Sequence, residues 1–235
     1  MTHDHRLTCR ALAALLHYPD DDLLAALPEI AAAFDGSTGL PAARRAELRA
    51  LVDLLQADDP IEAQARFVET FDRGRATSLH LFEHVHGDSR DRGPAMVSLG
   101  EMYEQAGLAL TSDELPDHLT VVLEFASTQP RAVVRGFLGE MAHILTAIFS
   151  ALRERRSPYA CVIAAVLELA GQPVQAAAVE ADAPIDEAWE EPPAFGGCST
   201  RGQSAPDLPQ PIRIVRSREA LEPRASRDSA QGAAR

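Results

Sequence analysis

The sequence contains no lysine, and all 22 of its basic residues are arginine. Without a lysine amine, the chain can neither form a Schiff base nor build the lysine clamp of a P-loop nucleotide site. Acidic residues number 35, which gives a net charge of −13 and leaves no lysine-rich patch of the kind that binds nucleic acid or anionic lipid. These absences exclude several enzyme classes and argue against a nucleic-acid partner.

Cysteine is scarce as well. Cys9, Cys161 and Cys198 are far apart and form no C-x-x-C pair, so that neither a disulfide framework nor a thiolate zinc site is expected. Cys9 and Cys161 fall on apolar helical segments, where we expect them to be buried packing residues. Residues 1–18 lack the order of a signal peptide, and charges interrupt every apolar run before the roughly 18 residues of a membrane span. We therefore expect a cytoplasmic protein without stable membrane insertion.

Aromatic residues make up only 5% of the chain, whereas the hydrophobic fraction of 46% is rich in alanine and leucine. This composition favours helices over sheet. Apolar residues recur at helical spacing in residues 5–17, 20–34, 41–56, 60–71, 94–106, 115–125, 130–156 and 158–169. The sequence therefore predicts an all-α fold, a single bundle of about seven to nine helices within residues 1–172.

The longest predicted helix starts at Pro130 and ends at a basic cluster, Arg153 to Arg156, which suits the negative end of a helix dipole. Its apolar face is broad and runs from Val133 to Leu152. We expect this single helix to lie at the centre of the bundle.

Residues 173–235 are rich in alanine, proline, glycine, serine and alternating charge, without sustained periodicity. Such a composition predicts a mostly disordered tail. Trp189, the only tryptophan, stands there in an acidic run, and an aromatic side chain in such a tail often docks on a folded surface. The segment around Trp189 is therefore a candidate docking segment.

Between residues 72 and 93 the chain becomes polar and rich in arginine and histidine. His80, His84 and His86 lie close together, and histidines four apart on a helix can share a metal ion. Glu83, however, is out of register for a metalloprotease helix, and the sequence offers no distant ligand. The pattern favours a structural or recognition role and leaves a metal-dependent hydrolase built on the three histidines as the alternative.

Catalytic motifs are absent: the sequence has no G-x-S-x-G, no G-x-G-x-x-G and no Walker motif. Asp117 and Glu124 are carboxylates near His118, and such a pair can perform acid–base chemistry. No nucleophile or cofactor motif accompanies them, and surface helices commonly carry such neighbours. We predict a binding protein that is not an enzyme.

Three segments carry a family resemblance. They read Phe67-Val-Glu-Thr-Phe-Asp-Arg-Gly74, Ser78-Leu-His-Leu-Phe-Glu-His-Val-His-Gly87 and Ser89-Arg-Asp-Arg-Gly93, and Leu115-Pro-Asp-His-Leu119 supports them. In these segments the chain resembles the NarJ branch of the redox-enzyme maturation chaperones, which is related more loosely to the TorD and DmsD groups. The resemblance covers residues 7–189.

The resemblance implies an all-helical cytoplasmic chaperone for respiratory nitrate reductase. It would bind the N-terminal segment of the apo catalytic α subunit and support insertion of the molybdenum cofactor before the enzyme docks at the membrane. It would retain neither a cofactor nor a metal of its own. A sister chaperone that serves another molybdoenzyme remains a second alternative.

We expect the partner segment to lie as an amphipathic helix in an apolar groove, with carboxylates such as Glu69, Asp72 and Asp117 meeting its basic residues. The candidate partner-binding residues are those of the polar stretch and of the Leu115 segment: Glu69, Phe71, Asp72, Arg73, His80, Phe82, Glu83, His84, His86, Arg90, Arg92, Asp117 and His118.

Overall fold

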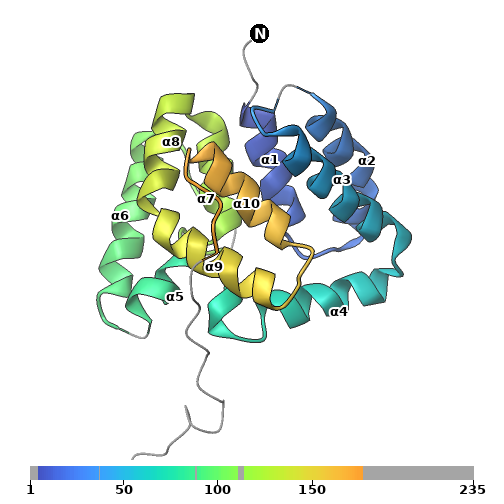
Figure 1. Cartoon of the computed structure of the whole chain (residues 1–235). Coiled ribbons are helices and arrows are strands. Elements are labelled where there is room, and N and C mark those ends of the chain that lie inside the picture. The colour runs from blue at the N-terminus through green and yellow to red at the C-terminus, as the bar shows by residue number, and fades with distance from the viewer. Residues whose placement is uncertain (1–4, 37, 88, 111–113, 177–235) are drawn as a thin grey trace, which may run out of the picture. The chain divides into compact units, whose positions relative to one another are not determined.

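The computed structural model describes residues 5–36, 38–87, 89–110 and 114–176, and within these residues it contains ten α-helices, one short 3₁₀-helix and no strand (Figure 1). In chain order they are α1 (His5–Leu15), α2 (Asp21–Asp35), α3 (Ala42–Ala57), α4 (Pro60–Phe71), η1 (Arg75–Thr77), α5 (Leu81–His86), α6 (Arg92–Gln105), α7 (Leu119–Thr128), α8 (Arg131–Glu140), α9 (Ala142–Glu154) and α10 (Ala160–Leu169). The prediction of an all-α fold is confirmed. The predicted tail and the segment around Trp189 lie outside the described residues.

Local sequence explains where the early helices begin. Asp20 caps α2, because its carboxylate accepts a hydrogen bond of 2.9 Å from the backbone N–H of Leu23. Asp59 caps α4 in the same way, and Pro60 occupies the first turn, where its missing N–H costs nothing. Pro28 lies inside α2 without ending it.

The centre of the bundle is α10, of which nine of ten residues are buried. It contacts α1, α3, α8 and α9, whereas α1 packs mainly along α7 and α2 (Figure 1). A helix in contact with neighbours on every side must be apolar all round, and the sequence Ala-Cys-Val-Ile-Ala-Ala-Val-Leu meets that demand. Cys161 and Cys9 are both buried, as expected.

The prediction of one long central helix from Pro130 is wrong. The segment is broken at Met141 into α8 and α9, which are bent by 69° relative to each other. Gly136 and Gly139 weaken the helix just before the break, and the bend lets both halves contact α10. In the described part of the chain no single helix is long and apolar enough to cross a membrane; only α8 and α9 taken together reach that length and composition.

The polar stretch forms η1, α5 and the start of α6. Helix α5 contacts α6, η1 and α9, and η1 packs against α9. This arrangement brings the stretch next to the turn that precedes α7.

Candidate functional site

Two segments of the resemblance meet through the backbone. The N–H of Leu81 donates to the carbonyl of Asp117 at 3.1 Å, and the N–H of Leu119 donates to the carbonyl of Leu79 at 2.9 Å. These two bonds form an antiparallel bridge centred on His80 and His118, which we call the His80–His118 bridge. The bridge joins the start of α5 to the start of α7.

The Asp117 side chain is fully buried behind the His80–His118 bridge. Its Oδ2 accepts a hydrogen bond of 3.0 Å from the N–H of Phe82 and lies 3.7 Å from Nη2 of Arg92. Its Oδ1 lies 3.6 Å from Nδ1 of His80. Burial alone would raise the pKa of Asp117, but His80, the Phe82 N–H and Arg92 together hold it below its usual range. One buried carboxylate thus ties together α5, α6 and the turn before α7.

Arg92 connects this carboxylate to Glu83. Its Nη1 lies 3.2 Å from Oε1 of Glu83, whose Oε2 accepts a hydrogen bond of 2.6 Å from the Ser78 hydroxyl. Burial acts to raise the pKa of Glu83, and the Ser78 hydroxyl and Arg92 outweigh it and lower the pKa. The carbonyl of Ser78 also accepts a hydrogen bond of 2.9 Å from Nε2 of His84. Glu83, His84 and Arg92 therefore hold the fold of the polar stretch itself.

The C-terminal end of α5 depends on Gly87. This residue has φ +53°, and a Cβ added to it would lie 2.1 Å from Nη2 of Arg75. Arg75 donates from Nε and Nη2 to the carbonyl of Glu83, at 3.3 and 3.1 Å. The same carbonyl accepts a hydrogen bond of 3.1 Å from the N–H of Gly87, so both interactions hold the end of α5. Glycine at this position serves both the left-handed backbone and the approach of the guanidinium group.

The rings of His80 and His118 pack edge to face, with centroids 4.9 Å apart. Nδ1 of His118 shares a hydrogen bond of 2.6 Å with the Thr120 hydroxyl and lies 4.0 Å from Oε2 of Glu114. Burial lowers the pKa of His118, which the Glu114 carboxylate opposes. Contact with the Asp117 carboxylate raises the pKa of His80, against the effect of burial.

The structure does not bring His80, His84 and His86 into one cluster. His84 is bonded to Ser78, and His86 packs edge to face on Phe82 with centroids 5.8 Å apart. The ligand set of the alternative hydrolase is therefore not assembled. Within the described ranges, the one group of histidine, cysteine and acidic side chains whose donor atoms lie close enough to share a metal is His80, Glu114 and His118.

The remaining candidate residues divide by exposure. Phe71 is buried at the end of α4, with its ring 5.1 Å from that of Tyr159, so its role here is packing. Phe82 is half-buried against the core. The exposed candidates, open to a partner, are Glu69, Asp72, Arg73 and Arg90. Asp117 is too deeply buried to meet a partner's basic residue directly in this conformation, contrary to our expectation for that carboxylate.

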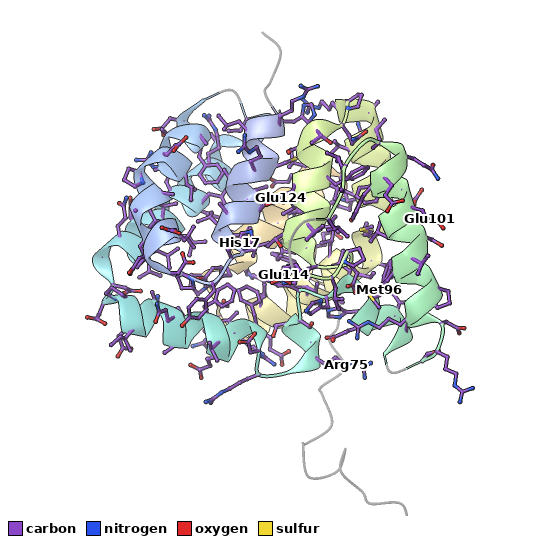
Figure 2. All side chains as sticks on the ribbon, turned by 180° about the vertical axis from the view of Figure 1, so that it is seen from behind. His17, Arg75, Met96, Glu101, Glu114 and Glu124 are labelled. Carbon is purple, nitrogen blue, oxygen red and sulfur yellow. The ribbon has the colours of Figure 1, made fainter. Side chains whose placement is uncertain are left out.

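An apolar hollow of about 570 Å³ lies beside the bridge, between α1 and α7, with α6 and the segment that follows α6 as its other wall. Its lining is Arg10, Ala14, His17, Tyr103, Leu108, Ala109, Leu110, Val121, Glu124, Phe125, Ser127 and Thr128. Polar groups come from both sides: Nε2 of His17, which follows the end of α1, lies 3.9 Å from Oε1 of Glu124 on α7. Figure 2 labels both residues in the view from behind. We refer to this feature as the α1–α7 hollow.

Tyr103 links the hollow to the bridge. Its hydroxyl donates a hydrogen bond of 2.9 Å to the carbonyl of Pro116, and its ring lies 4.7 Å from that of Phe125. Burial raises the pKa of Tyr103 well above its usual range. None of the lining residues was among the predicted partner-binding residues. Helical spacing in the sequence predicts the apolar faces of residues 5–17 and 115–125. It does not predict that these two helices pack against each other.

Comparison with known proteins gives consistent matches. The family model described as nitrate reductase delta subunit matches residues 37–165. Over 182 residues the chain is 43% identical to the nitrate reductase molybdenum cofactor assembly chaperone NarJ of Escherichia coli. The aligned segment covers 77% of this chain and 77% of the E. coli protein. It is 31% identical over 161 residues to a NarJ protein of Bacillus subtilis, covering 68% of this chain and 85% of the other.

Among solved structures, the chain is similar to a protein of Archaeoglobus fulgidus assigned to redox enzyme maturation. The TM-score is 0.50 at 21% sequence identity, and the match covers 71% of this chain and 94% of that one. A likeness at this level of identity supports the fold alone, and it agrees with the all-helical architecture described above.

Proposed function

This chain belongs to the nitrate reductase delta subunit family as a NarJ-type assembly chaperone, and on that premise we propose that its client is the apo catalytic α subunit of a nitrate reductase. The supporting observation is the 43% identity to the E. coli assembly chaperone over 77% of both chains. The chaperone would hold the α subunit until the molybdenum cofactor is inserted and would release it before membrane docking. We place this step in the cytoplasm and assign no catalysed reaction to the chain.

We propose that the N-terminal segment of the α subunit binds as an amphipathic helix in the α1–α7 hollow. An apolar floor with polar groups at its rim is what a helix-in-groove complex requires. A hollow of about 570 Å³ is large enough for a few apolar anchor side chains. Leu110 lines it and is 41% exposed, so it offers contact area that a partner can cover.

Charge supports the same partner. The chain carries a net charge of −13, and Glu124 stands exposed at the rim of the hollow. An acidic surface favours a segment with basic residues and speeds its encounter, although apolar burial supplies most of the affinity. The exposed residues Glu69, Asp72, Arg73 and Arg90 lie outside the hollow and remain proposed contacts for other parts of the client.

In this proposal the His80–His118 bridge acts indirectly. It fixes the start of α7, and Tyr103 transmits that placement to α6 through the Pro116 carbonyl. Both helices form walls of the hollow. Buried residues of the resemblance, such as Asp117, would thus shape the binding surface without touching the client.

Calorimetry with the N-terminal peptide of the α subunit tests the binding surface. The wild-type chain is expected to bind the peptide, and Leu110→Glu is expected to weaken binding at least about tenfold, because a charge would enter an apolar contact. Val133→Glu is the matched control: Val133 is 47% exposed on α8 and does not line the hollow. Equal affinity of the two variants would place the peptide elsewhere. A client pull-down that returned a different molybdoenzyme would point to the sister-chaperone alternative.

A further inference from the structure

His80, Glu114 and His118 place three metal-binding side chains at one point of the surface. The donor atoms of the three residues all lie within 4.8 Å of one another. Figure 2 shows Glu114 near the middle of that view, on the same side of the molecule as His17 and Glu124. No sequence motif joins the three residues, because His80 lies 34 positions before Glu114 and comes from a different part of the fold.

The two histidines are held by the backbone. They stand opposite each other in the His80–His118 bridge, whose two hydrogen bonds of 3.1 and 2.9 Å fix the chain on either side of each ring. Ligands carried on a paired backbone lose little conformational entropy when a metal binds. The geometry is therefore organised before any ligand arrives.

The surroundings of His80 resemble those of a metal-ligating histidine. Such a ring usually directs one nitrogen to the metal and the other to a carboxylate or carbonyl that fixes its orientation. Asp117 takes this position for His80, with Oδ1 at 3.6 Å from Nδ1. Both atoms are buried, and neither has a hydrogen-bond partner among the residues that the structure describes. Oδ1 of Asp117 is therefore available to orient the His80 ring, while Oδ2 accepts the hydrogen bond from the Phe82 N–H and faces Arg92.

We propose that His80, Glu114 and His118 form a Zn²⁺ site. Two imidazoles and one carboxylate are a common donor set for this ion, and three protein ligands leave a fourth position for water or for a group from a partner. Donor atoms around a tetrahedral zinc ion lie about 3.4 Å apart. Because the donor atoms lie up to 4.8 Å apart, the cluster must close by as much as about 1.4 Å. The exposed Glu114 side chain can supply its part of that movement.

The site goes beyond the assembly function and does not depend on it. It differs from the histidine set of the hydrolase alternative, since it shares only His80 with that set, and no reaction is assigned to it. It also departs from the expectation that the chain binds no metal.

Zinc titration of the full chain, stripped of metal by a chelator, tests the proposal. A chromophoric zinc indicator should report one tight equivalent for the wild-type chain. Glu114→Gln and His118→Ala should each weaken binding by at least about tenfold. His143→Ala is the control, because His143 is exposed on α9 outside the cluster and should leave the affinity unchanged.

Circular dichroism should show that each variant is folded. His118 precedes α7 and is partly buried, so the exposed Glu114→Gln variant decides the question if His118→Ala fails to fold. Absence of a tight equivalent in the wild-type chain would overturn the proposal. So would a Glu114→Gln variant that binds zinc as tightly as wild type, or a loss of binding in His143→Ala.

Discussion

The carboxylate of Asp117 accepts a hydrogen bond of 3.0 Å from the backbone N–H of Phe82, 35 positions away in the chain. This bond satisfies a free N–H in the first turn of α5, and the same side chain faces His80 and Arg92. A fully buried charge is tolerable only when it is paired in this way. The arrangement makes Asp117 the structural anchor of the region on which the proposed binding surface depends.

Replacing Asp117 by alanine should destabilise the fold. The variant leaves the Phe82 N–H and the Arg92 guanidinium without their buried partner, and we expect the free energy of unfolding to fall by about 3 kcal/mol. Urea denaturation followed by circular dichroism measures it. Glu101→Ala on the exposed side of α6 (Figure 2) is the control and should change stability by less than about 0.5 kcal/mol. Equal effects of the two substitutions would contradict the role of Asp117.

Two glycines should respond in opposite directions to alanine. Gly87→Ala forces a side chain into φ +53° and against Arg75, and should cost about 1–2 kcal/mol. Gly100 lies within α6 with nothing within 4 Å of the added Cβ, and Gly100→Ala should stabilise by about 0.5–1 kcal/mol. Thermal unfolding of both variants compares them. A neutral Gly87→Ala would mean that the end of α5 does not require this conformation.

The two described thiols should be inert in the folded chain. Burial raises the pKa of Cys9 and of Cys161 to about 12, so that at pH 8 only about one part in 10⁴ of either is thiolate. Cys198 lies outside the described residues, and the substitution Cys198→Ser removes its thiol so that the reagent reports only on Cys9 and Cys161. In that background a thiol reagent should label the unfolded chain rapidly and the native chain on the timescale of unfolding. Rapid labelling of the native chain at either position would show that the core around α1 or α10 is open.

Exposed residues after α4 should affect function without affecting stability. Asp72 and Arg73 project from the surface, so Asp72→Ala and Arg73→Ala should leave the unfolding midpoint nearly unchanged. If they contact the client, cells that rely on either variant should show less nitrate reductase activity than cells with the wild-type chain. Asp53→Ala, on the exposed face of α3, is the control. Full activity with both variants would remove these residues from the client surface.

Sequence patterns predict most of the helices because their signals are local. Asp59 and Pro60 mark the start of α4, and the apolar spacing up to Phe71 marks its extent. The break at Met141 escapes such reasoning, because residues 130–156 keep a continuous apolar face and only contact with α10 makes the bend favourable. The described residues form ten helices where the sequence predicts seven to nine. One predicted helix is divided into α8 and α9, and the polar stretch contains α5, which the periodicity does not predict.

The site depends on contacts between distant parts of the chain. The resemblance identifies both His80 and His118, but their pairing arises from backbone bonds across the fold, which periodicity does not report. The sequence also does not predict that Asp117 is buried, because an aspartate next to a proline is typical of an exposed turn. The α1–α7 hollow combines residues from both ends of the sequence and becomes apparent only when α1 lies along α7.

The most direct test of the proposed function is whether the purified chain captures the apo α subunit of nitrate reductase through its N-terminal segment. Size-exclusion chromatography of the mixture would compare the full-length apo subunit with one that lacks this segment. We predict that the full-length subunit elutes as a complex with the chain and that the truncated subunit elutes alone. Equal complex formation by both subunits would contradict recognition of the segment, and no complex with either would contradict the chaperone assignment.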